Sequence, residues 1–168
     1  MIVQPRAVST DRPYYGVYPG IVAANEENGA GDPQGRVKLR LPWYDPDLVT
    51  DWCRVVQPYA GPGFGLYLVP EVGTEVLVSF LFGDFTCPVV LGSLWNGQDK
   101  PQEVRGGARD VKVLRTRGGH EIRLDDSAGA AKIEIVSADG SKLTLSPQGI
   151  AIETAGTLTL KGATIHLN

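Results

Sequence analysis

The sequence of 168 residues contains little cysteine and no motif built on cysteine. Cys53 and Cys87 are the only two, they form no CxxC pattern, and no cluster of histidines lies near either in the sequence. Neither their number nor their spacing calls for a disulfide, and a zinc site needs several thiolate or imidazole ligands around one ion. The pattern favours two buried free thiols over a disulfide.

Long hydrophobic runs are also missing. The first residues, MIVQPRAVSTDRPYYG, contain no continuous apolar stretch of the kind found in secretion signals. No stretch elsewhere approaches the roughly eighteen apolar residues that a membrane-spanning helix needs. We therefore expect neither a signal peptide nor a membrane-spanning helix.

Positive charge is not in excess. The formal net charge is −3, with ten acidic and six basic residues in 1–98 and nine acidic and ten basic residues in 99–168. Arg36, Lys38 and Arg40 form a basic row along one predicted strand, but no aromatic residues alternate with them, as stacking of single-stranded nucleic acid requires. The sequence predicts no nucleic-acid partner.

Glycine and proline are plentiful, and they separate short runs rich in valine, leucine and isoleucine. This pattern is typical of an all-β protein. In residues 14–98 it predicts a compact antiparallel barrel, with a glycine-rich loop at 61–65. The expected strands are residues 15–23, 36–41, 52–58, 66–69, 75–82 and 88–94.

The last fifty residues hold a ladder of apolar pairs. Each pair consists of two Ile or Leu residues separated by one residue, and turn-forming residues lie between the pairs. Since side chains alternate across a strand, each pair places two apolar side chains on one face. The pairs are Ile122 and Leu124, Ile133 and Ile135, Leu143 and Leu145, Ile150 and Ile152, Leu158 and Leu160, and Ile165 and Leu167.

This ladder predicts an assembly of several chains. It contains no helical segment that might cover the apolar face, and one chain cannot enclose such a face by itself. Several copies around a common axis bury every apolar pair and leave no lateral sheet edge except at the ends. We therefore predict that the twelve ladder residues form the core of an oligomer, and that the chain divides into an N-terminal arm (1–13), a barrel (14–98), a linker (99–117) and a needle (118–168).

The barrel region resembles the baseplate assembly protein V family of contractile phage tails, whose barrel also occurs in type VI secretion spike proteins. The matching blocks are residues 15–22 (YGVYPGIV), 35–43 (GRVKLRLPW), 52–55 (WCRV), 60–65 (AGPGFG), 70–78 (PEVGTEVLV), 82–84 (FGD) and 88–94 (PVVLGSL). The resemblance implies an oligonucleotide/oligosaccharide-binding (OB) fold that trimerises.

The ladder resembles the C-terminal needle of the same family in residues 117–126 (RGGHEIRLDD) and 161–168 (KGATIHLN). This second resemblance implies an intertwined triple-stranded β-helix. The number three comes from the family, whereas the requirement for assembly comes from the residues. The expected fold is thus all-β, with an N-terminal OB-fold barrel and a C-terminal triple-stranded β-helix in a homotrimer.

We expect no catalytic residues. Some spikes of this family carry a lysozyme domain between barrel and needle, but only residues 99–117 occupy that position here, which is too few for a catalytic domain. Asp125 and Asp126 are the most suggestive carboxylate pair, yet they are followed by Ser127 and Gly129, as in a turn. His120 follows two glycines and lacks neighbouring ligands, so we interpret it as a residue at the start of a strand.

The C-terminal residues predict a docking site for another protein. Ile165, His166, Leu167 and Asn168 would form a blunt end, and the resemblance implies that this end receives a separate tip protein of the PAAR-repeat type. His166 is the only candidate metal ligand there, and it should point outward because Ile165 and Leu167 point inward. The His-x-His pair with which relatives bind an ion in their own tip is absent. We expect no cofactor; an ion in the needle axis or in the tip partner is left open.

Together these features predict a structural, non-enzymatic spike at the centre of a contractile tail baseplate. Its expected partners are two further copies of the chain, a baseplate hub protein, a tip protein and, transiently, the target cell envelope. The expected location is the virion tail, after synthesis in the host cytoplasm. Two alternatives are a spike of a type VI or extracellular injection system and a trimeric OB-fold module that binds oligosaccharide or nucleic acid.

Overall fold

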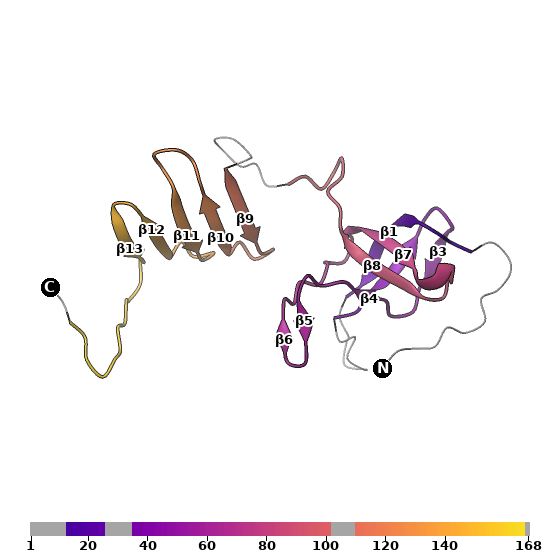
Figure 1. Cartoon of the computed structure of the whole chain (residues 1–168), viewed down its shortest axis with the longest axis horizontal. Coiled ribbons are helices and arrows are strands. Elements are labelled where there is room, and N and C mark those ends of the chain that lie inside the picture. The colour runs from indigo at the N-terminus through magenta and orange to yellow at the C-terminus, as the bar shows by residue number, and fades with distance from the viewer. Residues whose placement is uncertain (1–12, 26–34, 102–109, 167–168) are drawn as a thin grey trace. The chain divides into compact units, whose positions relative to one another are not determined.

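The computed structural model describes residues 13–25, 35–101 and 110–166. The chain forms two compact units, Met1–Pro101 and Gln102–Asn168. Every regular element in the described residues is a β-strand, apart from one 3-10 turn, η1 (Leu81–Gly83). No helix in this part of the chain has the length and apolar character needed to cross a membrane. Figure 1 shows the strands of both units.

The N-terminal unit is built around one six-stranded sheet, in the order β3-β2-β1-β7-β8-β4. All neighbouring strands are antiparallel except β4 and β8, which are parallel. Main-chain hydrogen bonds between Val37 and Cys53 link the entry to β2 with the entry to β4, at the far edge of the sheet. This link brings the two sides of the sheet together, as a barrel requires. The strands are β1 (Val17–Ala24), β2 (Lys38–Leu41), β3 (Asp45–Val49), β4 (Arg54–Val55), β7 (Glu75–Phe80) and β8 (Pro88–Ser93).

The core of this unit follows from alternation along the strands. In β7, Val76, Val78 and Phe80 are buried, while the residues between them are half-buried. In and before β2, Val37, Leu39 and Leu41 are completely buried, and Arg40 lies on the outer face. The remaining core members are Val22, Cys53 and Val90.

Both cysteines are free thiols, but only one of them is buried. Cys53 lies in the core, where burial raises the pKa of its thiol to about 11. Cys87 is exposed, in contrast to the expectation from sequence. It lies in the turn between β7 and β8, where its N–H donates to the carbonyl of Asp84. A turn residue of this kind stays at the surface because its backbone has to reverse direction there.

Residues 56–73 differ most from the predicted strands. The segment 66–69 forms no regular strand. Instead, the region expected as a loop contains a hairpin of two very short strands, β5 (Ala60–Gly61) and β6 (Phe64–Gly65). Strand β3 was also not foreseen, because Pro42 and Pro46 indicated the end of the preceding strand. At a sheet edge proline removes no required hydrogen bond.

Rings at one end of the barrel pack into an aromatic cluster. Tyr14 lies at its centre, with ring centroids 5.0 Å from Phe85 and 5.5 Å from Phe80. Tyr18 stacks on Trp43 at 4.8 Å, and the indole N–H of Trp43 donates to the carbonyl of Pro19 at 2.8 Å. The cluster closes the end at which β1 begins and β7 ends.

The C-terminal unit is a single antiparallel meander in which each strand pairs with the next, in the order β13-β12-β11-β10-β9 (Figure 1). Its first strand, β9, lies within residues 99–117, where the sequence analysis placed a linker. Residues 154–166 form no regular strand. The strands are β9 (Val111–Arg115), β10 (Glu121–Asp125), β11 (Lys132–Val136), β12 (Lys142–Ser146) and β13 (Gly149–Glu153).

The barrel core predicts the effect of a single truncation. Leu39 is completely buried, so Leu39→Ala should lower the free energy of unfolding of the N-terminal unit by about 2–5 kcal/mol, through lost transfer energy and a cavity. Urea denaturation followed by tryptophan fluorescence measures this unit alone, because Trp43, Trp52 and Trp95 all lie in it. The control is Leu91→Ala, at a leucine that is 41% exposed. Equal midpoints for both variants would contradict the core assignment.

Candidate assembly interface

The registers of the C-terminal sheet align the apolar pairs into two continuous rows. Ile122 lies opposite Ile135, and Leu124 lies opposite Ile133. The alignment continues through β12 to β13, and Leu114 of β9 extends the first row. Directly opposed side chains lie on the same face of a sheet, so both rows share one face. The first row is Leu114, Ile122, Ile135, Leu143 and Ile152, and the second is Lys112, Leu124, Ile133, Leu145 and Ile150.

The described residues of the C-terminal unit leave much of this apolar face exposed. Ile122, Leu124, Ile133 and Ile135 are 42–45% exposed, and at the edge strand β13 Ile150 reaches 72%. Leu143 and Leu145, in the adjoining strand, are half-buried. A contiguous exposed apolar surface of this kind marks an interaction site in a soluble protein. The structure therefore brings together eight of the twelve residues predicted as oligomer core.

The other four predicted core residues lie beyond the regular sheet. Leu158, Leu160 and Ile165 are each about half exposed, at 52%, 56% and 49%, in a segment without regular strands. Leu167 and Asn168, which belong to the predicted docking end, lie outside the described residues. His166 is exposed next to Ile165. In the residues that the structure describes, no three His, Cys, Asp or Glu side chains converge as a metal site would need.

The opposite face of the sheet carries a network of ion pairs. Arg115 and Arg123 lie 3.7 and 3.9 Å from the carboxylate of Glu121. Lys132 and Lys142 lie 3.2 and 3.4 Å from one carboxylate oxygen of Glu134. Along each strand these charged residues alternate with the residues of the two apolar rows. The two faces of the sheet therefore differ sharply in polarity. The charged face suits contact with water, and the apolar face suits contact with other chains.

Glu134 is the most buried charged residue of this network, at 8% exposure. Burial acts to raise the pKa of its carboxyl group, but hydrogen bonds and charge from Lys132 and then Lys142 outweigh burial and hold the pKa below its ordinary value. The carboxylate is therefore the stable form in the folded sheet. Its two lysine partners come from Glu134's own strand and from the strand beside it, so the network ties β11 to β12.

The turns between the strands account for the remaining candidate residues. Asp125 accepts a hydrogen bond from the backbone N–H of Ser127 at 3.0 Å, and hydrogen bonds from Ser127 lower the pKa of its carboxyl group. The backbone N–H of Asp126 donates to the carbonyl of Asp110. His120 accepts a hydrogen bond at Nδ1 from the N–H of Ala138, which connects two neighbouring turns. These contacts shape the turns and assemble no acid–base pair.

Lys38 of the basic row makes an aromatic contact that the sequence does not predict. The Nζ atom of Lys38 lies 5.1 Å from the ring centroid of Trp52. A single cation–π contact of this kind fixes the lysine on its own strand face. Stacking of single-stranded nucleic acid requires a different arrangement, in which several aromatic rings alternate with the basic residues.

Comparison with known families covers most of both units. Residues 18–95 match the family described as the type VI secretion system/phage-baseplate injector OB domain, and residues 111–168 match the phage baseplate V C-terminal trimerisation domain. The chain belongs to the phage baseplate V family. Its barrel is an OB domain and its C-terminal sheet is part of a trimerisation domain. Across the matched residues the chain is a structural component of the baseplate or type VI spike kind.

Curated relatives of this baseplate V protein match about two thirds of the chain. The type VI secretion system spike proteins VgrG1a and VgrG2a of Pseudomonas aeruginosa are 35% and 28% identical in alignments that cover 62% and 66% of the chain. The actin cross-linking toxin VgrG1 of Vibrio cholerae is 32% identical in an alignment that covers 61% of the chain. The aligned parts are 18%, 14% and 10% of these relatives, so the chain spans less than a fifth of their length.

Sequence reasoning missed the first strand of the interface. Leu114 lies opposite Ile122 and extends the first apolar row, although the range 99–117 was predicted as a linker. The basic residues around Leu114 made the segment VKVLR resemble a charged linker. Those basic residues include Arg115, which pairs with Glu121 on the charged face. The signal that would have found β9 is this charge complementarity with β10.

The two faces predict opposite outcomes for neighbouring substitutions. Ile135→Asp should abolish the trimer, because carboxylates from each copy would meet in an apolar interior without partners. Val136→Asp on the same strand should leave it intact, since Val136 lies on the charged face opposite Glu121 and Lys142. Light scattering separates 18.0 kDa monomers from assemblies three times that mass. An Ile135→Asp protein that remains fully trimeric would refute the inward assignment.

Glu134 predicts a component of acid sensitivity. Its folded pKa is lowered, so its contribution to stability is complete above the ordinary glutamate value of about 4.3 and is lost as the pH falls through the lower folded value. The thermal midpoint of the C-terminal unit, measured by circular dichroism, should therefore decline less steeply below that pH in Glu134→Gln than in the unchanged protein. Glu153→Gln, at an exposed glutamate on β13, is the control and should retain the full decline. Identical profiles for all three proteins would exclude this role of Glu134.

Proposed function

We propose that the protein is the central spike of a contractile tail baseplate, that it works as a homotrimer, and that it pierces the target cell envelope when the sheath contracts. The observation that carries this proposal is the two-row apolar face of the C-terminal sheet, which belongs to a trimerisation domain and is uncovered in one chain. Three such faces turned toward one axis form a dry core.

The proposed action is mechanical. In each chain the strands from β9 to β13 are joined edge to edge by backbone hydrogen bonds. The first apolar row runs across all five strands, and the second runs across β10 to β13. A prism made from three such sheets cannot bend without breaking hydrogen bonds or opening its core to water. We infer that stiffness and slow unfolding, with no catalytic step, allow the needle to pass through a membrane.

We assign the parts of the spike as follows. Residues 1–13 are an N-terminal arm, residues 14–98 are the barrel that sits in the baseplate hub, and the needle begins with β9 at Val111. Residues 111–153 form one face of the prism from each chain, because their strands pair within the chain. We confine the intertwined triple-stranded geometry to residues 154–168, in which Leu158, Leu160 and Ile165 are about half exposed.

The far end of the needle is the proposed docking site for a separate tip protein of the PAAR type. Ile165, together with Leu167, supplies apolar surface from each chain, and unpaired strand edges supply main-chain donors and acceptors. His166 points to solvent in this proposal and holds no metal. The protein is made in the host cytoplasm and incorporated into the virion tail.

A second candidate function is that of a spike in a type VI secretion system. The relatives that favour it are named as type VI secretion spike proteins, and the match includes the barrel. The mechanical argument is the same for both candidates. They differ in the particle that holds the spike, so isolating the particle that contains this chain discriminates between them.

The docking proposal predicts that Ile165→Asp separates tip attachment from trimer formation. Since eight of the twelve predicted core residues lie in strands β10 to β13 and are unchanged, the variant should keep the trimer mass in light scattering. Electron microscopy of particles that carry it should show the spike without density beyond its end, whereas particles with Lys161→Asp, also exposed in this segment, should keep that density. Particles with Ile165→Asp that retain the tip at full occupancy would refute the docking site, and a purified wild-type chain that stays monomeric would refute the spike itself.

A further inference from the structure

The hairpin β5–β6 is a separate two-stranded sheet that projects from the barrel (Figure 1). Its strands pair at only two positions, Ala60 with Gly65 and Gly61 with Phe64. The ring of Phe64 lies directly over Gly61, where any side chain at position 61 would collide with it. Gly65 has φ +140 and lies against the backbone of Tyr59, a conformation and a closeness that favour glycine. The hairpin therefore has a defined shape.

The aromatic rings of this hairpin remain largely exposed, although they contact each other. Phe64 and Tyr59 pack on each other with centroids 5.4 Å apart, yet they are 53% and 61% exposed. Tyr67, just after the hairpin, is 76% exposed. An isolated two-stranded hairpin is only marginally stable in water. A shaped hairpin with exposed aromatic rings is thus expected to pack against something outside its own barrel.

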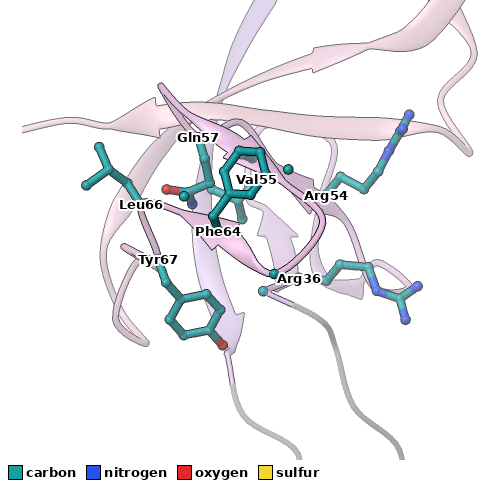
Figure 2. Close-up of a pocket in the computed structure, with 12 residues that line it drawn as sticks. Arg36, Arg54, Val55, Gln57, Phe64, Leu66 and Tyr67 are labelled. Carbon is teal, nitrogen blue, oxygen red and sulfur yellow. The ribbon is translucent and has the colours of Figure 1, made fainter.

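A cavity of about 540 Å³ lies at the base of the hairpin (Figure 2). Phe64 and Tyr67 form its apolar wall, and Arg54 extends from its rim. Gln57 holds the wall in place, since its side chain accepts from the N–H of Leu68 and donates to the carbonyl of the same residue, at 3.4 and 3.2 Å. The apolar wall suits an aromatic side chain, and the Arg54 guanidinium at the rim suits a carboxylate close to that side chain.

The exit segment of the barrel, residues 94–99, offers such a group. Strands β4 and β8 are parallel, so the hairpin that follows β4 and the exit segment that follows β8 lie at the same end of the barrel. The N–H of Leu94 and the side chain of Asn96 both bond to Glu75, which fixes this segment. Trp95 is 73% exposed within it, and Asp99 is exposed at the end of the same turn.

The partner favoured by this placement is a second copy of the chain. The C-terminal trimerisation domain brings three copies together, and only residues 102–110 separate it from the described barrel region. A tether of this length raises the effective concentration of neighbouring barrels to about the millimolar range. Each barrel therefore encounters the barrels of the other copies far more often than it encounters a protein free in solution. This argument rests on the trimer of the proposed function.

We propose that the β5–β6 hairpin of each protomer grips the barrel of the next copy, and that Trp95 of that copy fills the cavity between Phe64 and Tyr67. Asp99 of the incoming segment then lies near the Arg54 guanidinium. The hairpin of each copy packs on the next copy, and each copy also contacts the hairpin of the copy before it. Three copies therefore close a ring. The barrels are thereby held in register independently of the needle.

Site-specific photo-cross-linking of the full chain tests this contact. A photoreactive benzoylphenylalanine replaces Phe64 in one protein and, as the matched control, Tyr15 in another. Tyr15 is also an aromatic residue with high exposure, 71%, but it lies at the opposite end of the barrel, next to the start of β1. After illumination, position 64 should convert most of the chain to covalent dimers and trimers, and position 15 should leave it at 18.0 kDa. Mass spectrometry should locate the attachment in a peptide that contains Trp95.

The outcomes separate this inference from the proposed function. A trimeric mass in light scattering with no interchain cross-link from position 64 overturns the hairpin contact and leaves the spike standing. A cross-link to another part of the neighbouring barrel overturns the role of Trp95. A monomeric mass overturns the spike, and the hairpin contact with it.

Discussion

The in-register alignment of apolar side chains across the C-terminal sheet is the constraint on which the rest of the molecule depends. Each strand contributes residues to both rows, and the antiparallel registers keep those residues opposite one another from β9 to β13. A one-residue slip in any strand would move its apolar side chains to the charged face. A slip between β11 and β12 would also break the contact of Glu134 with Lys142. The charged face therefore helps to fix the register of the apolar face, and the apolar face requires other chains.

The two units solve the problem of burial in different ways. The barrel encloses its own core, where Leu39, Val76 and Val90 have no contact with water. The C-terminal sheet forms its strands alone but leaves its apolar face open, with Ile150 72% exposed. A unit of the first kind is stable as one chain, whereas the second gains most of its stability on association. The family assignment of an OB domain and a trimerisation domain agrees with this physical difference.

The sequence alone predicts the parts of this fold that rest on periodicity. The alternation from Arg36 to Leu41 predicted the strand that contains the buried Leu39, and the spaced pairs predicted β10 to β13 together with the face that they share. Where local signals conflict, prediction from sequence fails. Pro46 indicated the end of a strand, but an edge strand tolerates proline, so β3 was not predicted. The basic residues around Leu114 indicated a linker, because their acidic partners lie on another strand, so β9 was not predicted. The hairpin was missed because four residues in two strands carry no period, and its shape depends on the contact between Phe64 and Gly61.

The meander of the C-terminal unit also bears on how spikes of this kind change in evolution. Adding or deleting one pair of consecutive strands keeps the direction of the chain and the phase of both apolar rows. The neighbouring strands still meet Ile or Leu at the same positions, and the barrel is not affected. Each such event changes the length of the sheet by about 9–10 Å, twice the spacing between strands. Tandem duplication or loss of hairpins thus offers a stepwise route by which the length of the C-terminal sheet can change.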